Sequence, residues 1–338
     1  MPVDGDLLAV TGAGVRRAGR DRVVILRALG LGDLLAGVPA LRALAEGLGP
    51  PQRELLLVTP RALAPLVALI PGPARRRLRV AGADGLRSLP AAAAGAGLAV
   101  NLHGSGPQSH ELLLRSGPGA LLAFRHDAVP AAADGPAWDP GEHEAARWCR
   151  LVRHAGLDAD PARLDLAPPR AAREHPLSGA TVVHPGAASV ARRWPAERFA
   201  AIAQAEAATG RSVVVTGGPG ELPLARRVAA AAGLPAAAVL AGRTSVAELA
   251  ALVAAAGRVV CGDTGVAHLA TAFGTPSVVL FGPTPPASWG PPPARRHRHR
   301  VVWSGRSGDP HGEATDPGLL AIGTERVLRE LQTLELGA

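Results

Sequence analysis

The chain has 338 residues and a formal net charge of +8, and all 36 of its basic residues are arginine. The absence of lysine excludes a P-loop lysine, a Schiff-base lysine and any other catalytic lysine. The positive charge favours acidic partners such as nucleotide phosphates, anionic lipid or nucleic acid. With aromatic residues at only 3%, there is little surface on which single-stranded nucleic acid could stack, so we expect no nucleic-acid partner.

Length and hydrophobic content indicate two globular domains, since 47% of the residues are hydrophobic and can bury a sizeable core. No apolar run reaches the length of about 18 residues that a membrane span needs. The first residues, with Asp4 and Asp6, do not resemble a signal peptide. Cys149 and Cys261 form no CxxC motif, which favours free thiols in a reducing compartment. We therefore predict a cytoplasmic protein.

Residues 1–20 contain a partial match to a dinucleotide-binding fingerprint. An apolar run ends in Thr-Gly-Ala-Gly, but no third glycine or alanine follows at the required place. The next strand begins by Arg22, which leaves almost no room for a helix. We predict that residues 1–20 are an N-terminal extension, and a nicotinamide oxidoreductase is disfavoured.

The first secure strand covers residues 21–28, and a glycine-containing turn follows it. The apolar spacing after the turn predicts a helix over 34–48. Asp33 stands between the two, where its carboxylate can cap the helix or point into a cleft above the sheet. In the second position it could act as a general base toward a bound hydroxyl. The residue alone leaves both interpretations open.

The rest of the first half alternates short apolar runs with helical segments, which indicates a parallel, doubly wound sheet. His103 lies in a glycine-rich turn at the end of one of these strands. Strands are predicted over 54–59, 78–80, 98–102 and 121–124, and helices over 61–70, 109–114 and 142–155.

The second half opens with a strand over 180–183 and a long polar loop that ends in Arg192-Arg193-Trp194-Pro195. The two arginines can hold phosphate through bidentate forks, or can be solvated surface charge. Pro195 suits the first position of a helix that runs to about 209. Trp194 is interpreted as a packing residue.

A strand over 211–215 leads into a glycine turn and Glu221. The carboxylate could bind ribose hydroxyls, or could be an acid favoured by a helix N-terminus. A helix to 232 and a short strand over 238–241 follow. Ser245 and Glu248 are spaced as a capping box at the start of a helix over 245–256.

Residues 257–284 form a strand, turn, helix, turn and strand in succession. Arg258–Cys261 and Ser277–Phe281 are apolar runs suited to buried strands, and a helix over 266–273 ends at Gly274-Thr275-Pro276. The helix N-terminus favours an anion. Asp263 or Thr264 could merely cap the helix, but taken together the residues Asp263, Thr264, Gly265 and His268 favour a phosphate or diphosphate site.

A proline-rich loop over 283–300 ends in Arg-Arg-His-Arg-His-Arg. Its histidine spacing could suggest metal, but without a scaffold of further ligands we predict a solvated basic loop that can touch an anionic acceptor or membrane surface. A strand over 301–303 and a helix over 323–336 complete the chain.

Four stretches of the chain resemble glycosyltransferase family 9, the heptosyltransferase-like enzymes of the GT-B fold. The order and spacing agree from about residue 22 to 335. The stretches are Leu29-Gly30-Leu31-Gly32-Asp33 with Val38-Pro39-Ala40-Leu41; His184-Pro185-Gly186 through Arg193-Trp194-Pro195; Gly217-Gly218-Pro219-Gly220-Glu221; and Gly262 through Ala270, continuing to Gly274-Thr275-Pro276 and Phe281-Gly282-Pro283-Thr284.

The resemblance implies two Rossmann-like domains that face a central cleft. It places an acceptor-binding domain at 21–165, a linker at 166–178 and a nucleotide-sugar-binding domain at 179–338. The implied reaction is an inverting, metal-independent transfer of heptose or a similar hexose from a nucleoside-diphosphate sugar, with ADP-sugar favoured, to a hydroxyl of a glycan or glycolipid. No cofactor is implied. A peripheral contact with the inner face of an anionic membrane is a further option, and an inactive nucleotide-sugar-binding protein or a GT-B epimerase remains an alternative.

By position, Asp33 is similar to the family's general base. Glu221 is similar to its ribose-binding acid, and Asp263, Thr264, Gly265 and His268 are similar to its diphosphate cradle. Arg193 stands where heptosyltransferases often have lysine. The predicted substrate-binding residues are Gly32, His184, Ser189, Arg192, Arg193, Glu221, Asp263, Thr264, Gly265 and His268.

Overall fold

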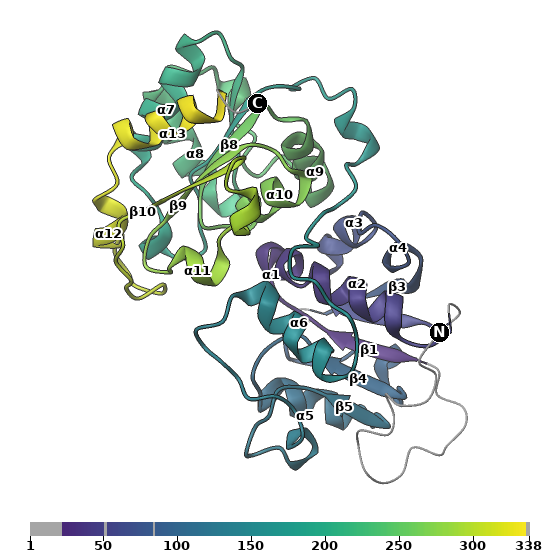
Figure 1. Cartoon of the computed structure of the whole chain (residues 1–338). Helices are drawn as coiled ribbons and strands as arrows, with labels where there is room; N and C mark the ends of the chain where they lie inside the picture. Colours follow the sequence, from purple (N-terminus) through teal and green to yellow (C-terminus); the bar gives the residue numbers. More distant parts are fainter. Residues whose placement is uncertain (1–21, 51–52, 84, 336–338) are drawn as a thin grey trace. The chain divides into compact units, whose positions relative to one another are not determined.

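The computed structural model describes residues 22–50, 53–83 and 85–335. The chain divides into two compact units, unit 1 (Met1–Leu166) and unit 2 (Ala167–Ala338), whose elements are labelled in Figure 1. The predicted N-terminal extension, residues 1–20, lies outside the described residues. Within the described ranges, no helix has both the length and the apolar character needed to cross a bilayer.

Unit 1 contains a five-stranded parallel sheet in the order β3-β2-β1-β4-β5. Val24 and Leu26 of β1 belong to an apolar cluster with Leu112 and Leu113 of α5, and the alternate residues of β1 are buried as well. Strands covered on both faces explain the continuous apolar runs in the sequence. The strands are β1 (Val23–Leu26), β2 (Leu55–Thr59), β3 (Leu78–Gly82), β4 (Leu98–Asn101) and β5 (Ala120–Leu122).

The helices of unit 1 are mostly short, and α2 packs against α6. They are α1 (Leu31–Ala36), α2 (Val38–Gly47), α3 (Ala64–Val67), α4 (Ala74–Arg77), α5 (Gln108–Arg115) and α6 (Glu144–His154), with 3₁₀ turns η1 (Arg61–Leu63), η2 (Ala91–Ala93) and η3 (Pro130–Ala132).

Unit 2 repeats this architecture with a second parallel sheet in the order β10-β9-β8-β6-β7. One face is covered by α7, α8 and α13, whose Phe199, Val228 and Leu331 share an apolar cluster with the strands. The strands are β6 (Thr181–His184), β7 (Val213–Val215), β8 (Arg258–Gly262), β9 (Ser277–Phe281) and β10 (His299–Trp303).

Helices α9 and α10 of unit 2 pack against each other. The helices are α7 (Ala196–Ala208), α8 (Leu222–Ala231), α9 (Val246–Ala255), α10 (Gly265–Phe273), α11 (Pro286–Trp289), α12 (Pro317–Leu320) and α13 (Thr324–Glu335), with 3₁₀ turns η4 (Arg170–Ala172), η5 (Val190–Arg192), η6 (Pro219–Glu221), η7 (Ala236–Ala238) and η8 (Pro293–Arg295). The predicted fold class, α/β with two doubly wound parallel sheets, is confirmed.

Several local predictions are confirmed. Ser245 accepts a hydrogen bond from the N–H of Glu248, whose carboxylate accepts one from Ser245 N, so the capping box forms. Gly274 ends α10 with a left-handed φ of 71°. Trp194 is buried in the core, and both cysteines are free and buried.

Other local predictions are wrong. The helix predicted over 34–48 is two helices, because Gly37 interrupts it and Pro39 cannot donate the hydrogen bond that would continue α1. The strand predicted over 238–241 is η7 followed by a single bridge from Val239 to Val215. Pro195 is the N-cap of α7 and not its first helical residue.

Candidate functional site

Asp33 lies in the first turn of α1, directly after Gly32, and it is not the N-cap. The N-cap is Gly30, whose backbone N–H donates a hydrogen bond to the Asp33 carboxylate. Asp33 is half-buried, and burial raises the pKa of its carboxyl above the ordinary value, while the charge of Arg27 opposes the rise. The carboxylate is therefore more basic than that of an exposed aspartate.

Arg27 fixes the backbone around Asp33. It follows β1 directly and is fully buried. Its Nε donates a hydrogen bond to the carbonyl oxygen of Asp33 at 2.6 Å, and its Nη1 donates to the carbonyl of Leu102 at the end of β4. Gly37 leaves room for this side chain, since an ideal Cβ there would lie 2.8 Å from Arg27 Nε.

Glu144, at the start of α6, is the countercharge of Arg27. Its Oε1 lies 3.2 Å from Arg27 Nη2 and accepts a hydrogen bond from Trp148 Nε1 at 2.7 Å, and its Oε2 pairs with Arg147. The Arg27 guanidinium also stacks 4.8 Å from the centroid of Trp148. The sequence analysis missed this cluster. The signal that the sequence offered for this cluster was Arg27, an arginine that directly continues a buried apolar strand.

His103 follows β4 in the turn that the sequence marked as polar. The side chain of Asn101 holds this turn, because Asn101 Oδ1 accepts a hydrogen bond from His103 N at 2.8 Å. Burial and the nearby charge of Arg27 lower the pKa of His103 to about 4. The imidazole is thus neutral at neutral pH, and its buried Nδ1 has no hydrogen-bond partner within the described part of the chain.

In unit 2, His184 and Glu221 belong to adjacent strand ends. His184 is the last residue of β6, and its Nδ1 lies 3.0 Å from Thr216 Oγ1. The Glu221 carboxylate accepts a hydrogen bond from Gly218 N at 2.7 Å. It also lies against Gly186, where an ideal Cβ would come within 2.1 Å of Glu221 Oε1. The two predicted loops therefore meet at the carboxyl ends of β6 and β7.

Ser189, Arg192 and Arg193 lie on the loop around η5. Ser189 Oγ accepts a hydrogen bond from Ala191 N at 3.3 Å and so caps the 3₁₀ turn. Arg193 Nε donates to the carbonyl of Ala187 at 2.9 Å, which orients its guanidinium. The Nε of Arg192 is buried and has no hydrogen-bond partner among the residues described.

Asp263, Thr264 and Gly265 form the turn between β8 and α10, next to the η5 loop. An ideal Cβ on Gly262 would lie 3.3 Å from the carbonyl oxygen of Arg192, so the two segments are in contact. Thr264 is the N-cap of α10, but its side chain makes no capping hydrogen bond. Ala267 N donates to the carbonyl oxygen of Thr264 at 3.0 Å, so among the described residues the N–H groups of Gly265 and Val266 are the ones left for another acceptor.

Asp263 is buried close to the charge of Arg192. Burial raises the pKa of its carboxyl to about 6, and Arg192 limits the rise. The Thr264 hydroxyl is also buried and has no hydrogen-bond partner in the described ranges. His268 lies one turn further along α10 and packs edge-on against Trp289, with ring centroids 5.8 Å apart. The structure thus brings together all the predicted residues of this turn.

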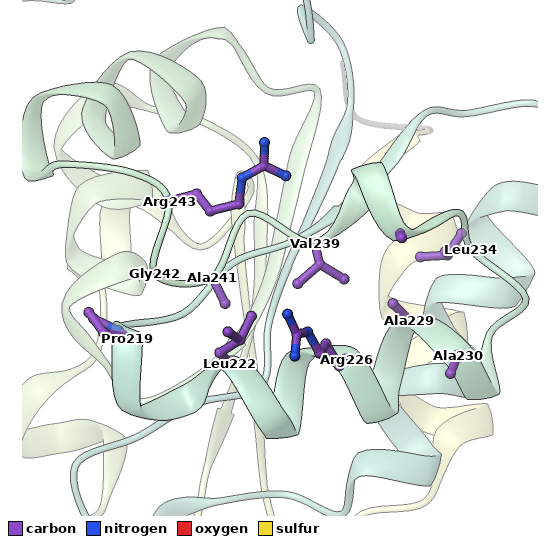
Figure 2. Close-up of a pocket in the computed structure, with 11 residues that line it drawn as sticks. Pro219, Leu222, Arg226, Ala229, Ala230, Leu234, Val239, Ala241, Gly242 and Arg243 are labelled. Atoms are coloured by element: carbon purple, nitrogen blue, oxygen red, sulfur yellow. The ribbon is translucent and has the colours of Figure 1, made fainter.

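A pocket of about 660 Å³ lies between α8 and the segment from Val239 to Arg243, and Figure 2 shows the residues that line it. Its walls are mostly apolar, and Arg226 and Arg243 supply positive charge. The pocket adjoins Glu221, since Gly217 is close to both Glu221 and Ala241. Sequence analysis did not predict this pocket, because the segment after η7 was assigned to a strand.

The chain was compared with known proteins. Residues 135–318 match the model of glycosyltransferase family 9 (heptosyltransferase). Lipopolysaccharide heptosyltransferase 3 of Escherichia coli is 35% identical over 112 residues, which are 32% of this chain and 33% of that protein. The matched segments span 33% to 47% of the length of the curated relatives.

Solved structures extend the likeness to both units. A family 9 glycosyltransferase from Veillonella parvula has a TM-score of 0.76 and 22% identity, over 95% of this chain and 99% of that one. The ADP-heptose lps heptosyltransferase II of E. coli has a TM-score of 0.74 and 21% identity, over 93% and 98% of the two chains. These likenesses show the GT-B fold.

Proposed function

Because the chain belongs to glycosyltransferase family 9, we propose that it is an inverting, metal-independent glycosyltransferase. It moves heptose or a similar hexose from a nucleoside-diphosphate sugar to a hydroxyl of a glycan or glycolipid. The observation that carries the proposal is the family match over residues 135–318, because this range includes every donor-binding residue predicted in unit 2. Two of the similar proteins are an ADP-heptose enzyme and a lipopolysaccharide heptosyltransferase, which supports an ADP-sugar donor and a glycolipid acceptor.

The diphosphate of the donor would bind at the N-terminus of α10. The helix N–H groups, the Thr264 hydroxyl and the guanidinium groups of Arg192 and Arg193 are donors of suitable charge. When the glycosidic bond breaks, negative charge develops on the departing diphosphate, and these groups would stabilise it. The protein thus carries the positive charge that a metal ion supplies in other transferases, which supports a metal-independent reaction.

The nucleoside would bind beside Glu221. The carboxylate is held by Gly218 N and could accept hydrogen bonds from the two ribose hydroxyls. The pocket of Figure 2 adjoins it and would receive the base against Ala241 and Gly242. A mostly apolar pocket with a few polar groups is typical of nucleotide sites.

Asp33 would be the general base. Its carboxylate would take the proton of the acceptor hydroxyl as that oxygen forms a bond to the anomeric carbon. The bond from the anomeric carbon to the diphosphate oxygen breaks in the same step, which inverts the configuration. Burial raises the basicity of Asp33, and Arg27 keeps the loop in place through the carbonyl of Asp33. Asp33 lies outside the range of the family match, so this role rests on the geometry of unit 1.

We also propose a cytoplasmic location. The two buried free thiols support a reducing compartment. Peripheral contact with an anionic membrane would bring the enzyme to a glycolipid acceptor.

The proposal is tested by measuring ADP release from ADP-heptose in the presence of lipopolysaccharide core acceptors, with EDTA present. We expect Asp33→Asn to lower turnover by about 10²–10⁴-fold, because the amide cannot take a proton. The affinity for ADP, measured by calorimetry, should not change. The control is Asp127→Asn, an exposed aspartate of unit 1.

Wild-type turnover in Asp33→Asn would exclude the base role while leaving the transferase in place. A wild-type protein that binds no nucleoside diphosphate would contradict the proposed function as a whole. Turnover that is lost on adding EDTA would refute metal independence.

A further inference from the structure

A basic groove lies in unit 2 along the edge strand β10, and none of the residues assigned to the donor lines it. Its volume is about 360 Å³. Arg296, Arg300 and Arg326 line it, and Glu330 is the single acid among the lining residues. The groove lies between β10, the α11 segment and α13, which are labelled in Figure 1. The lining therefore carries an excess of positive charge, and it has no residue in common with the proposed donor site.

His299 is a buried donor in the wall of this groove. It is 1% exposed, so the prediction of a fully solvated basic loop over 283–300 is wrong at this residue. Its Nδ1 lies 2.8 Å from the hydroxyl of Ser277 on β9. Its Nε2, on the opposite side of the ring, is buried without a hydrogen-bond partner among the described residues. When Ser277 donates to Nδ1, Nε2 carries the proton, and this N–H has no acceptor among the described residues.

The arginines of the groove also lack hydrogen-bond acceptors or acidic partners within the described residues. The Nε of Arg300 is buried and has no hydrogen-bond partner in the described part of the chain. Arg326 and Arg296 are exposed, and no ion pair joins them to an acid within the described residues. By contrast, Arg295 and Arg298 of the same loop donate to backbone carbonyls of α10 and its C-cap. The groove thus combines two buried nitrogens without partners among the described residues, on His299 and Arg300, with the exposed guanidinium groups of Arg296 and Arg326.

We propose that this groove binds a phosphate group, at a site distinct from the one that holds the donor diphosphate. The planar fork of arginine matches the oxygens of phosphate, and the His299 Nε2 proton adds a further donor. The phosphate can belong to a soluble phosphomonoester or to an anionic lipid. The inference does not depend on sugar transfer, because it concerns binding at β10 alone.

The test is a calorimetric titration of inorganic phosphate and glycerol phosphate into the full chain in the presence of saturating ADP. We expect Arg300→Gln/Arg326→Gln to weaken phosphate binding at least tenfold. The control is Arg329→Gln, an exposed arginine on the same helix that does not line the groove, which should stay within twofold of wild type. Because Arg326 is exposed, Arg326→Gln alone keeps the fold and should weaken binding about threefold.

The source of the phosphate is found with vesicles of phosphatidylcholine, with and without phosphatidic acid. Sedimentation with the acidic vesicles alone, lost in the double variant, identifies a lipid source. Binding of glycerol phosphate without vesicle binding identifies a soluble one. Phosphate binding that is absent in wild type, or equal in wild type and both variants, would overturn the proposal.

Discussion

The buried carboxylate of Asp263 makes a quantitative prediction about stability. Its pKa rises from an ordinary 3.8 to about 6, mainly through burial, with Arg192 in opposition. A pKa that is higher in the folded state means that folding favours the protonated form. The contribution of Asp263 to the free energy of unfolding is therefore complete below pH 3.8 and is lost as the pH rises toward 6. At about 1.4 kcal/mol for each pKa unit, the loss amounts to about 3 kcal/mol.

The substitution Asp263→Asn removes this cost, because the amide keeps the shape and stays neutral. Between pH 4 and pH 7 we expect the variant to gain about 2–3 kcal/mol of unfolding free energy relative to wild type. Other groups titrate in the same range, and burial lowers the pKa of His299 to about 4, which acts in the opposite direction. The difference between wild type and variant cancels these contributions.

The assay is hydrogen exchange of peptides from β8 and β9, with both proteins in the same buffer so that intrinsic exchange rates cancel. The control is Asp309→Asn, an exposed aspartate of unit 2. If the difference in unfolding free energy between wild type and Asp263→Asn changes by less than about 0.5 kcal/mol from pH 4 to pH 7, the reasoning is refuted. A variant that becomes less stable than wild type at pH 7 would show that Arg192 outweighs burial.

Two further predictions concern the two units separately. Glu144→Ala should destabilise unit 1 by about 3–5 kcal/mol, because Arg27 and Arg147 lose their buried countercharge. The control Glu142→Ala removes a more exposed ion pair and should cost under about 1 kcal/mol. Equal effects of the two variants on the hydrogen exchange of β1 peptides would contradict this prediction. Gly186→Ala should weaken ADP binding about tenfold, since its Cβ displaces the Glu221 carboxylate that would hold the ribose, a loss of about one to two hydrogen bonds. Gly220→Ala meets no atom within 4 Å and should bind ADP as wild type does, so the idea fails if the two variants agree.

Elements with local signals could be predicted from the amino-acid sequence. The β8-turn-α10-turn-β9 unit was predicted from residues 257–284, because buried parallel strands must be apolar throughout and a left-handed C-cap requires a residue such as Gly274. The capping box at Ser245 was predicted for the same reason, since its partners are three residues apart. The resemblance to family 9 rested on such short stretches, and the family match confirms it.

Contacts between residues far apart in the chain could not be predicted, because they depend on how the elements pack. Arg27 and Glu144 are 117 residues apart, and nothing in either segment names the other as its partner. Glu221 reaches Gly186 because the parallel strands β6 and β7 end side by side. Arg326 and His299 line one groove because α13 packs against β10. Sequence spacing fixes hydrogen bonds within one turn of a helix, but burial, pKa and the pairing of charges depend on how whole elements pack. For this reason the sequence could mark Asp33 as a candidate general base, but it could not reveal the buried pair of Arg27 and Glu144 that holds its backbone.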